Sequence, residues 1–284
     1  MVRLISYNIE YDEGLVGRWY DYLKLWRLFR APPDMDMKIV EFLKKQKPDI
    51  IALIEVDHGS FRSRYRDEAR FYEHEMGFEN VTEAIKYPFN LIGRLFHSVP
   101  ILRKQSNALI SRYNLYNIKH HLLHHGAKRM VIEATANCPK KPVTFIVAHL
   151  ALGYGTRQVQ LKELAHIIRR ITHPVILMGD FNTFNGLHEL DYLIKNTHLA
   201  FSYGLNKSSL RYTFPAWHPN RRLDYILHSA AIHIIDYKVL KCEFSDHLPV
   251  MVDFEFAGRK GSVKKNVSGK KAGRKAVKKA VRKK

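Results

Sequence analysis

Several short apolar segments end directly on a polar or charged residue, and this pattern limits the possible folds more than any other feature. Residues 50–54 are entirely apolar and precede Glu55, and residues 175–178 are apolar and precede Gly179 and Asp180. Short continuous apolar runs are typical of strands that are buried on both faces. Strands that end at one edge of a sheet would bring the polar residues at their ends together in a common pocket.

The predicted elements follow one another in an order that favours a mixed α/β fold. Runs with strand-like composition lie at residues 4–8, 50–54, 108–111, 129–136, 143–149, 175–178, 223–227 and 249–256. Helical spacing or a helical boundary signal marks residues 15–30, 36–47, 60–76 and 158–171. Because strands and helices are interspersed, we predict an α/β four-layer sandwich of two mixed, mainly antiparallel sheets flanked by helices.

The distribution of charge divides the chain into a folded domain, residues 1–258, and a C-terminal tail, residues 259–284. The whole chain has 47 Lys and Arg against 27 Asp and Glu, a formal net charge of +20. The tail holds 13 of these basic residues and no acidic one, so the preceding domain has a net charge of only +7. Such a composition predicts a disordered tail that binds polyanions without sequence preference. Nucleic acid and an anionic membrane surface are both suitable partners.

Cysteine and histidine usage gives no sign of a disulfide scaffold or a zinc site. Cys138 and Cys242 are too few for the first and lack the spacing for the second. The histidine tract at residues 120–125 has no predicted carboxylate or cysteine support, and we interpret it as a solvated or loop segment.

The N-terminus turns polar too early for a signal peptide, and no apolar stretch of about 18 residues is present. We therefore expect a cytoplasmic monomer that associates with nucleic acid.

The residues at the predicted strand ends have side chains that suit metal and phosphate chemistry. They are Asn8, Glu55, His149, Asp180, Asn182, Asp224, Asp246 and His247. Each has an ordinary explanation when taken alone, such as a turn cap for an Asn or a buried core position for a His. In one pocket, however, the carboxylate and amide oxygens would suit a hard cation such as Mg²⁺, and the imidazoles could transfer protons. The set therefore predicts metal-dependent hydrolysis of a phosphate ester.

These residues, in their order along the chain and in the residues next to them, resemble a known family. The relevant stretches are residues 6–8, 48–56, 107–112, 148–150, Arg157 with Gln160, 179–182, 223–226 and 245–250. Gly-Asp-Phe-Asn at residues 179–182 and Ser-Asp-His at residues 245–247 are specific when they occur together. Across residues 4–254 the chain resembles the endonuclease/exonuclease/phosphatase superfamily, which has the deoxyribonuclease-I-like fold.

The resemblance implies a metal site and its ligands. Asn8 and Glu55 match the metal-site positions, with Glu55 as the principal ligand, and Asp246 matches a further metal or supporting position. The implied cofactor is Mg²⁺, with Mn²⁺ as the alternative. Ile54 departs from the family pattern, in which a Gln often precedes the motif glutamate, but that Gln is not the main ligand.

The resemblance also implies the residues that carry the reaction. Asp180 matches the residue that orients or deprotonates the attacking water, and Asn182 matches its partner, which contacts the phosphate. His247 matches the histidine that stabilises the phosphoryl oxygens or transfers a proton. Asp224 matches the carboxylate that fixes the tautomer of that histidine. His149 matches the second histidine of the nuclease and sphingomyelinase branches.

The substrate is less well constrained, because function depends on what surrounds a site. Aromatic and basic side chains alternate in residues 15–30 and 88–104, where they could stack on bases, enter a membrane interface or pack on the core. Arg221 and Arg222 precede Asp224 and could bind a flanking phosphate. The triplet at residues 148–150 differs from that of abasic-site endonucleases, so abasic-site repair is disfavoured.

Three hypotheses follow for the function of the chain. The first is a divalent-metal-dependent phosphodiesterase that acts as a DNA endonuclease with little sequence preference. The second is a lipid phosphodiesterase of the sphingomyelinase type, or a phosphoinositide-type phosphatase, held at anionic membranes by the tail. The third is a nucleic-acid-binding module that has lost catalysis, which is disfavoured because every key position holds a competent residue.

Overall fold

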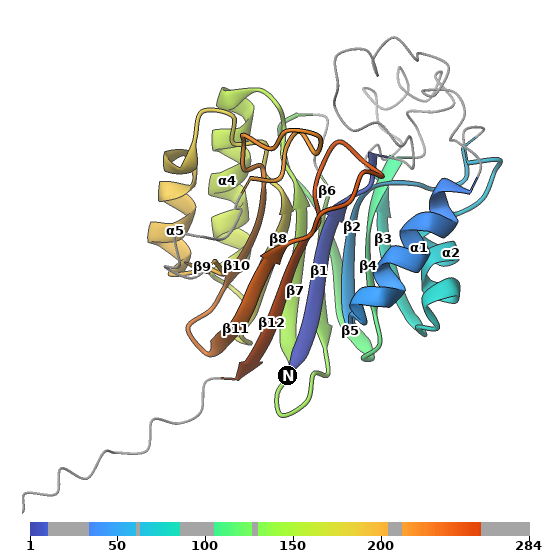
Figure 1. The fold of residues 1–284 in the computed structure, drawn as a ribbon. Coiled ribbons are helices and arrows are strands. Elements are labelled where there is room, and N and C mark those ends of the chain that lie inside the picture. The colour runs from blue at the N-terminus through green and yellow to red at the C-terminus, as the bar shows by residue number, and fades with distance from the viewer. Residues whose placement is uncertain (11–33, 61–62, 86–104, 127–129, 204–211, 257–284) are drawn as a thin grey trace, which may run out of the picture.

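Two six-stranded sheets pack face to face, and helices cover the outer face of each sheet (Figure 1). The computed structural model describes residues 1–10, 34–60, 63–85, 105–126, 130–203 and 212–256. Helices α1 and α2 lie against one sheet, and α4 and α5 lie against the other. The predicted four-layer α/β sandwich is therefore confirmed. The tail at residues 259–284 and the aromatic segments at residues 15–30 and 88–104 lie outside the described residues.

Each sheet places one parallel pair of strands at its centre. The first sheet, in spatial order, consists of β11 (Ile232–Val239), β12 (Val250–Phe256), β1 (Val2–Asn8), β2 (Ile50–Asp57), β4 (Gln105–Ser111) and β3 (Asn80–Ile85). The second consists of β5 (Leu115–Leu122), β6 (Met130–Ala136), β7 (Val143–His149), β8 (Val175–Asp180), β10 (Asp224–His228) and β9 (Ala200–Phe201). The strands β1 and β2 are parallel, as are β7 and β8, whereas the other described pairs are antiparallel. The sheets are thus mixed and mainly antiparallel, as predicted.

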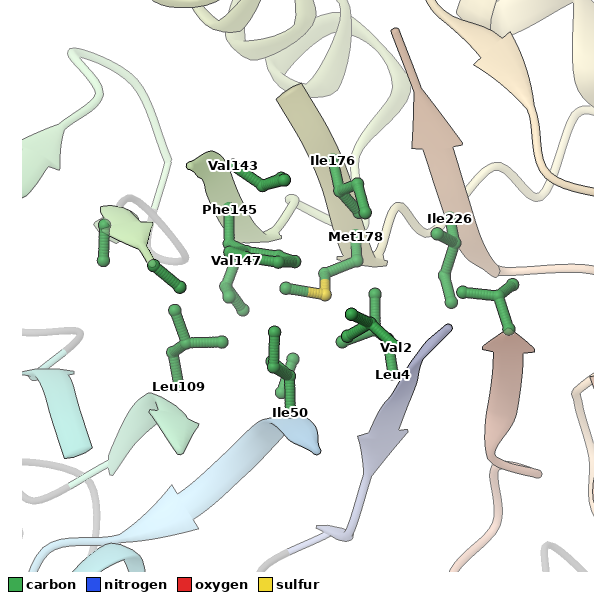
Figure 2. Packing of buried hydrophobic residues seen from close by; sticks show 14 of the residues in the cluster. Val2, Leu4, Ile50, Leu109, Val143, Phe145, Val147, Ile176, Met178 and Ile226 are labelled. Carbon is green, nitrogen blue, oxygen red and sulfur yellow. The ribbon is translucent and has the colours of Figure 1, made fainter. Parts of the chain in front are cut away.

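Burial on both faces explains why the central strands are apolar throughout. In β2, Ile50 and Ile54 face the other sheet, whereas Leu53 packs toward the helices. In β8, Met178 faces the other sheet and Leu177 packs toward α4 and α5. Figure 2 shows the side chains of the two sheets meeting in the central core. The continuous apolar runs follow from this geometry, because alternate residues enter two different apolar layers.

The helices begin at different residues from those predicted. Helix α1 spans Met35–Gln46, so it begins and ends one residue earlier than predicted. Helix α2 spans Glu68–Met76 and starts eight residues later than predicted, because the Asp67 side chain caps it by accepting a hydrogen bond from the Arg70 backbone N–H at 3.0 Å. Helix α4 spans Tyr154–Ile168, and the short helix α5 spans Asp191–Thr197.

A buried ion pair connects α4 to the short 3₁₀ helix η5 (Leu187–Leu190), which follows β8. The Arg157 side chain is 1% exposed, and its Nε donates to Glu189 Oε2 at 2.7 Å. The same guanidinium donates to the carbonyl oxygens of Ala151 and Leu152 at 2.9 and 2.6 Å. Because these carbonyls closely follow His149, the ion pair also fixes the loop at the end of β7.

We expect Glu189→Gln to lower the free energy of unfolding by about 3–5 kcal/mol, because it leaves the buried Arg157 charge without its counterion. Urea denaturation measures this change. The control is Asp236→Asn, which removes the exposed pair between Asp236 and Lys238 and should cost only about 0–1 kcal/mol. Equal losses in the two variants would contradict a structural role for the buried pair.

No helix within the described ranges combines the length and the apolar character that crossing a membrane requires.

Candidate active site

The two parallel strand pairs end at one edge of the sandwich and deliver four of the predicted residues there. Asn8 is the last residue of β1, and Glu55 lies near the end of β2. His149 and Asp180 are the last residues of β7 and β8, and they are paired in register. Interactions link the two sheets at this edge, since Asn8 Nδ2 donates to Asp180 Oδ2 at 3.2 Å. The predicted convergence of strand ends is therefore observed.

Two antiparallel strands begin at the same edge and add the remaining residues. Asp224 opens β10 and lies opposite Asp180 in the register. Residues 245–247 directly precede Leu248, Pro249 and β12, and the Ser245 hydroxyl donates to the Asn8 carbonyl oxygen at 2.7 Å. All eight predicted catalytic and metal-site residues thus lie in one connected group.

A glycine allows β7 and β8 to approach each other at the site. Gly179 has a φ of 136°, and a Cβ at this position would lie 1.9 Å from the Ala148 carbonyl oxygen. Any side chain here would therefore collide with the backbone of β7. Because Ala148 and Gly179 are paired, this close approach sets His149 beside Asp180.

Asp180 is the centre of the hydrogen-bond network. Its Oδ1 accepts from the Asn182 backbone N–H at 3.0 Å, and its Oδ2 accepts from Asn182 Nδ2 at 3.3 Å. Asn182 has a φ of 51°, a conformation that asparagine tolerates better than most residues. Its Nδ2 also donates to the Leu150 carbonyl oxygen at 2.9 Å. These contacts fix the orientation of both side chains.

His247 and Asp224 form a buried pair. His247 Nδ1 lies 2.8 Å from Asp224 Oδ2, and both side chains are at most 6% exposed. His247 Nε2 lies 3.9 Å from carboxylate oxygens of both Asp180 and Asp246. Burial lowers the pKa of His247, but the carboxylates of Asp224, Asp246 and Asp180 outweigh it and raise the pKa well above its ordinary value. The imidazole is therefore expected to be protonated at neutral pH.

His149 lies between Asp180 and Glu55. Its side chain is fully buried, with Nε2 3.4 Å from Asp180 Oδ2 and Nδ1 3.7 Å from Glu55 Oε1. Glu55 is 15% exposed and Asp246 is 16% exposed, whereas Asp180 and Asp224 are each 2% exposed. Glu55 and Asp246, the two predicted metal ligands that have carboxylates, are thus more exposed than Asp180 and Asp224.

The donor set fits a hard divalent cation. Asp180, Asp224 and His247 also form a group whose potential ligand atoms lie within 4.8 Å of one another. Because His247 Nδ1 is already hydrogen-bonded to Asp224, this inner group is less suited to holding an ion than the more exposed carboxylates. Glu55 and Asp246 would then supply carboxylate oxygens to the ion, which is the ligand type that Mg²⁺ prefers.

Arg221 and Arg222 lie beside the site in a pocket of about 370 Å³. Thr183, the residue after Asn182, also lines this pocket. The Arg222 guanidinium stacks 4.2 Å from the centre of the Tyr203 ring, and Arg221 Nη1 donates to the Phe184 carbonyl oxygen at 3.1 Å. The pocket therefore presents two cationic groups and aromatic surface next to the predicted catalytic residues.

The interpretation of the histidine tract was partly wrong. His120 and His121 lie on strand β5, not in a loop. Carboxylates that are distant in sequence do support the tract, because His121 Nε2 lies 2.6 Å from Glu133 and His124 Nδ1 lies 3.0 Å from Glu163. Sequence spacing gave no signal for either contact, since both depend on how β5 packs beside β6 and α4.

Comparison with known proteins assigns the chain to a family. The model of the endonuclease/exonuclease/phosphatase family matches residues 5–247, which include every predicted catalytic and metal-site residue. The chain belongs to the endonuclease/exonuclease/phosphatase family.

Similar proteins share the fold at low sequence identity. UPF0294 proteins of Yersinia pseudotuberculosis and Yersinia pestis are 28% identical over 156 residues, which cover 55% of this chain and 51% of each relative. The match thus spans about half the length of these relatives. The human nocturnin catalytic domain, with bound sulfate, has a TM-score of 0.63 at 22% identity, covering 90% of this chain and 94% of that domain. A mannosyl-6-phosphatase of Bacteroides thetaiotaomicron has a TM-score of 0.65 at 15% identity, covering 90% and 100%.

Proposed function

We propose that the protein is a phosphodiester hydrolase that depends on Mg²⁺ or Mn²⁺ and acts on DNA as an endonuclease with little sequence preference. The observation that carries this proposal is the buried pair of His247 and Asp224 beside Asp180, with Nδ1 of His247 2.8 Å from Asp224. This arrangement gives one nitrogen of the imidazole a fixed partner and turns the other toward the acidic side chains.

Asp180, His247 and Asp224 have different roles in the proposed hydrolysis. Asp180 accepts a proton from water, whose oxygen then attacks the phosphorus. The protonated Nε2 of His247 donates a hydrogen bond to a phosphoryl oxygen and stabilises the charge that develops there. The P–O bond to the leaving group breaks, and the leaving oxygen takes up a proton from solvent water, to which Asp180 releases the proton that it accepted. Asp224 keeps the imidazole oriented throughout.

The cation contributes charge neutralisation at the phosphate when it is bound. Glu55 and Asp246 are the side chains that would hold it. Asn8 supports the site from β1, where its Oδ1 accepts the Glu10 backbone N–H at 3.1 Å and its Nδ2 donates to Asp180.

The preference for DNA is supported by charge outside the catalytic centre. Arg221 and Arg222 offer cationic groups in the adjoining pocket, where Tyr203 and Phe184 add aromatic surface. A polynucleotide has a phosphate on each side of the scissile bond and bases that can stack on aromatic rings. The tail at residues 259–284 adds 13 positive charges.

A substrate panel tests this proposal. Supercoiled plasmid DNA, RNA, sphingomyelin vesicles and phosphoinositide vesicles are each incubated with the full chain and Mg²⁺, beside a His247→Ala control. We expect nicking of the plasmid by the wild type alone. Release of phosphocholine or inorganic phosphate from the vesicles, without nicking, would instead identify a lipid phosphodiesterase or a phosphoinositide phosphatase. Binding of DNA without any turnover would identify a binding module.

Deleting residues 259–284 should weaken DNA binding at low salt and flatten its salt dependence. The logarithm of the DNA association constant falls linearly with the logarithm of the salt concentration. For each phosphate contact that is lost, this slope becomes less steep by about 0.7–0.9. Binding of the full and shortened chains to one duplex is measured by fluorescence anisotropy at several salt concentrations. Identical curves for the two chains would show that the tail makes no contact with DNA.

A further inference from the structure

The principal candidate metal ligand, Glu55, lies at an irregularity of strand β2. The pairing of β2 with β4 shifts register between Ile54 and Val56, and Glu55 has a φ of 61°. A non-glycine residue in this left-handed region costs on the order of 1–3 kcal/mol unless its surroundings impose it. Such bulges interrupt the alternation of a strand and redirect a side chain. Here the redirected carboxylate lies 3.7 Å from His149.

Asn107 on β4 accepts the backbone N–H of this bulged residue. Asn107 lies opposite Ile54 in the register and is 1% exposed. Its side-chain Oδ1 accepts from the Glu55 N–H at 3.4 Å. This contact also fixes which end of the amide is oxygen, because the backbone N–H can only donate. The Asn107 side chain on β4 therefore accepts the Glu55 N–H at the point where the register shift interrupts the backbone pairing of β2 with β4.

The presence of an asparagine here is not explained by the stability of the fold. Its Nδ2 is buried and has no hydrogen-bond partner in the described structure. A buried donor without a partner costs about 1–3 kcal/mol. The residues beside it on either strand, Ile54 and Ala84, belong to the central apolar core, where Leu or Val would avoid this cost. A destabilising polar residue in a core is expected where function requires it.

We propose that Asn107 is a positioning residue that holds the Glu55 bulge and so directs the Glu55 carboxylate to the metal site. The inference rests on the proposed role of Glu55 as a metal ligand. Asn107 acts through the backbone of Glu55 and need not contact the ion or the substrate. No motif assigned it this role, because the contact depends on the register between β2 and β4.

Mn²⁺ binding by the full chain, measured calorimetrically, tests this role with two variants. Asn107→Leu removes the acceptor, and we expect Mn²⁺ to bind about 10–100-fold more weakly, as is usual when a supporting partner of a metal ligand is lost. Asn107→Asp keeps an oxygen acceptor at the same place, and it should bind Mn²⁺ at least as tightly as the wild type. Urea denaturation of Asn107→Leu should show little net change in stability, because removal of the unpaired Nδ2 offsets the loss of the acceptor for the Glu55 backbone N–H.

The possible outcomes separate this inference from the proposed function. If the wild type binds no Mn²⁺, the metal-dependent function fails. If the wild type binds Mn²⁺ and Asn107→Leu binds it equally well, the positioning role is wrong while the function stands. Weak binding by Asn107→Leu together with a large loss of stability, or equally weak binding by Asn107→Asp, would also overturn the positioning role.

Discussion

His247→Ala should reduce the turnover of phosphodiester bonds by about 10²–10³-fold, which is the usual effect of removing one preorganised hydrogen-bond donor from developing negative charge. The imidazole is buried, is held by Asp224 at 2.8 Å and faces Asp180 and Asp246 with its other nitrogen. Initial rates of plasmid nicking at saturating Mg²⁺ measure the effect.

Binding of DNA and a matched histidine variant serve as controls. DNA affinity should stay close to that of the wild type, since we propose that the basic groups outside the centre provide most of the binding. His233→Ala removes an exposed histidine of β11 and should retain full turnover. If His247→Ala turns over at a rate similar to that of His233→Ala, the role assigned to His247 is wrong.

Asp180→Asn should lower turnover by a comparable factor, about 10²–10⁴-fold, because an amide cannot accept the proton of the attacking water. The substitution keeps the shape of the side chain, and its remaining oxygen can still accept from the Asn182 backbone N–H. The new amide nitrogen, however, cannot accept from the Nδ2 groups of Asn8 and Asn182. The free energy of unfolding should therefore fall by no more than about 1–3 kcal/mol, because removal of one negative charge beside Asp224 offsets part of this loss.

The combination of lost turnover and a limited loss of stability is what distinguishes this prediction from simple damage to the fold. Kinetics and urea denaturation are measured on the same preparation, with Asp191→Asn at the exposed start of α5 as the control. A strong loss of stability in Asp180→Asn would show that Asp180 holds the structure together. Retained turnover would remove it from the reaction.

The sequence was most informative where burial leaves a clear pattern. The central strands β2 and β8 are apolar on both faces, so their positions and their polar ends could be predicted. Glu55 and Asp180 both lie beside His149, because the parallel strand pairs of the two sheets end at the same edge of the sandwich. The convergence of the predicted catalytic and metal-site residues at one edge of the sandwich could therefore be predicted from the sequence, whereas their roles remain predictions.

Edge strands and long-range contacts were not predictable in the same way. Strands β3, β5 and β11 lie at the edges of the sheets, where polar side chains interrupt the apolar pattern and weaken the signal. The start of α2 was misplaced because Asp67 caps it after a loop that Asp57 holds through hydrogen bonds to Ser60 and Ser63. The contact of Asn107 with Glu55 likewise depends on strand register, which the sequence does not display.

The measurement that tests the central claim most directly is nicking of supercoiled plasmid by the full chain as Mg²⁺ is titrated, with and without a chelator. The account predicts nicking that rises with Mg²⁺, disappears with chelator, returns when the cation is restored, and is lost in Glu55→Gln at the same Mg²⁺ concentrations. Nicking that persists in excess chelator, or that is unchanged in Glu55→Gln, would contradict a metal-dependent hydrolase built on this site.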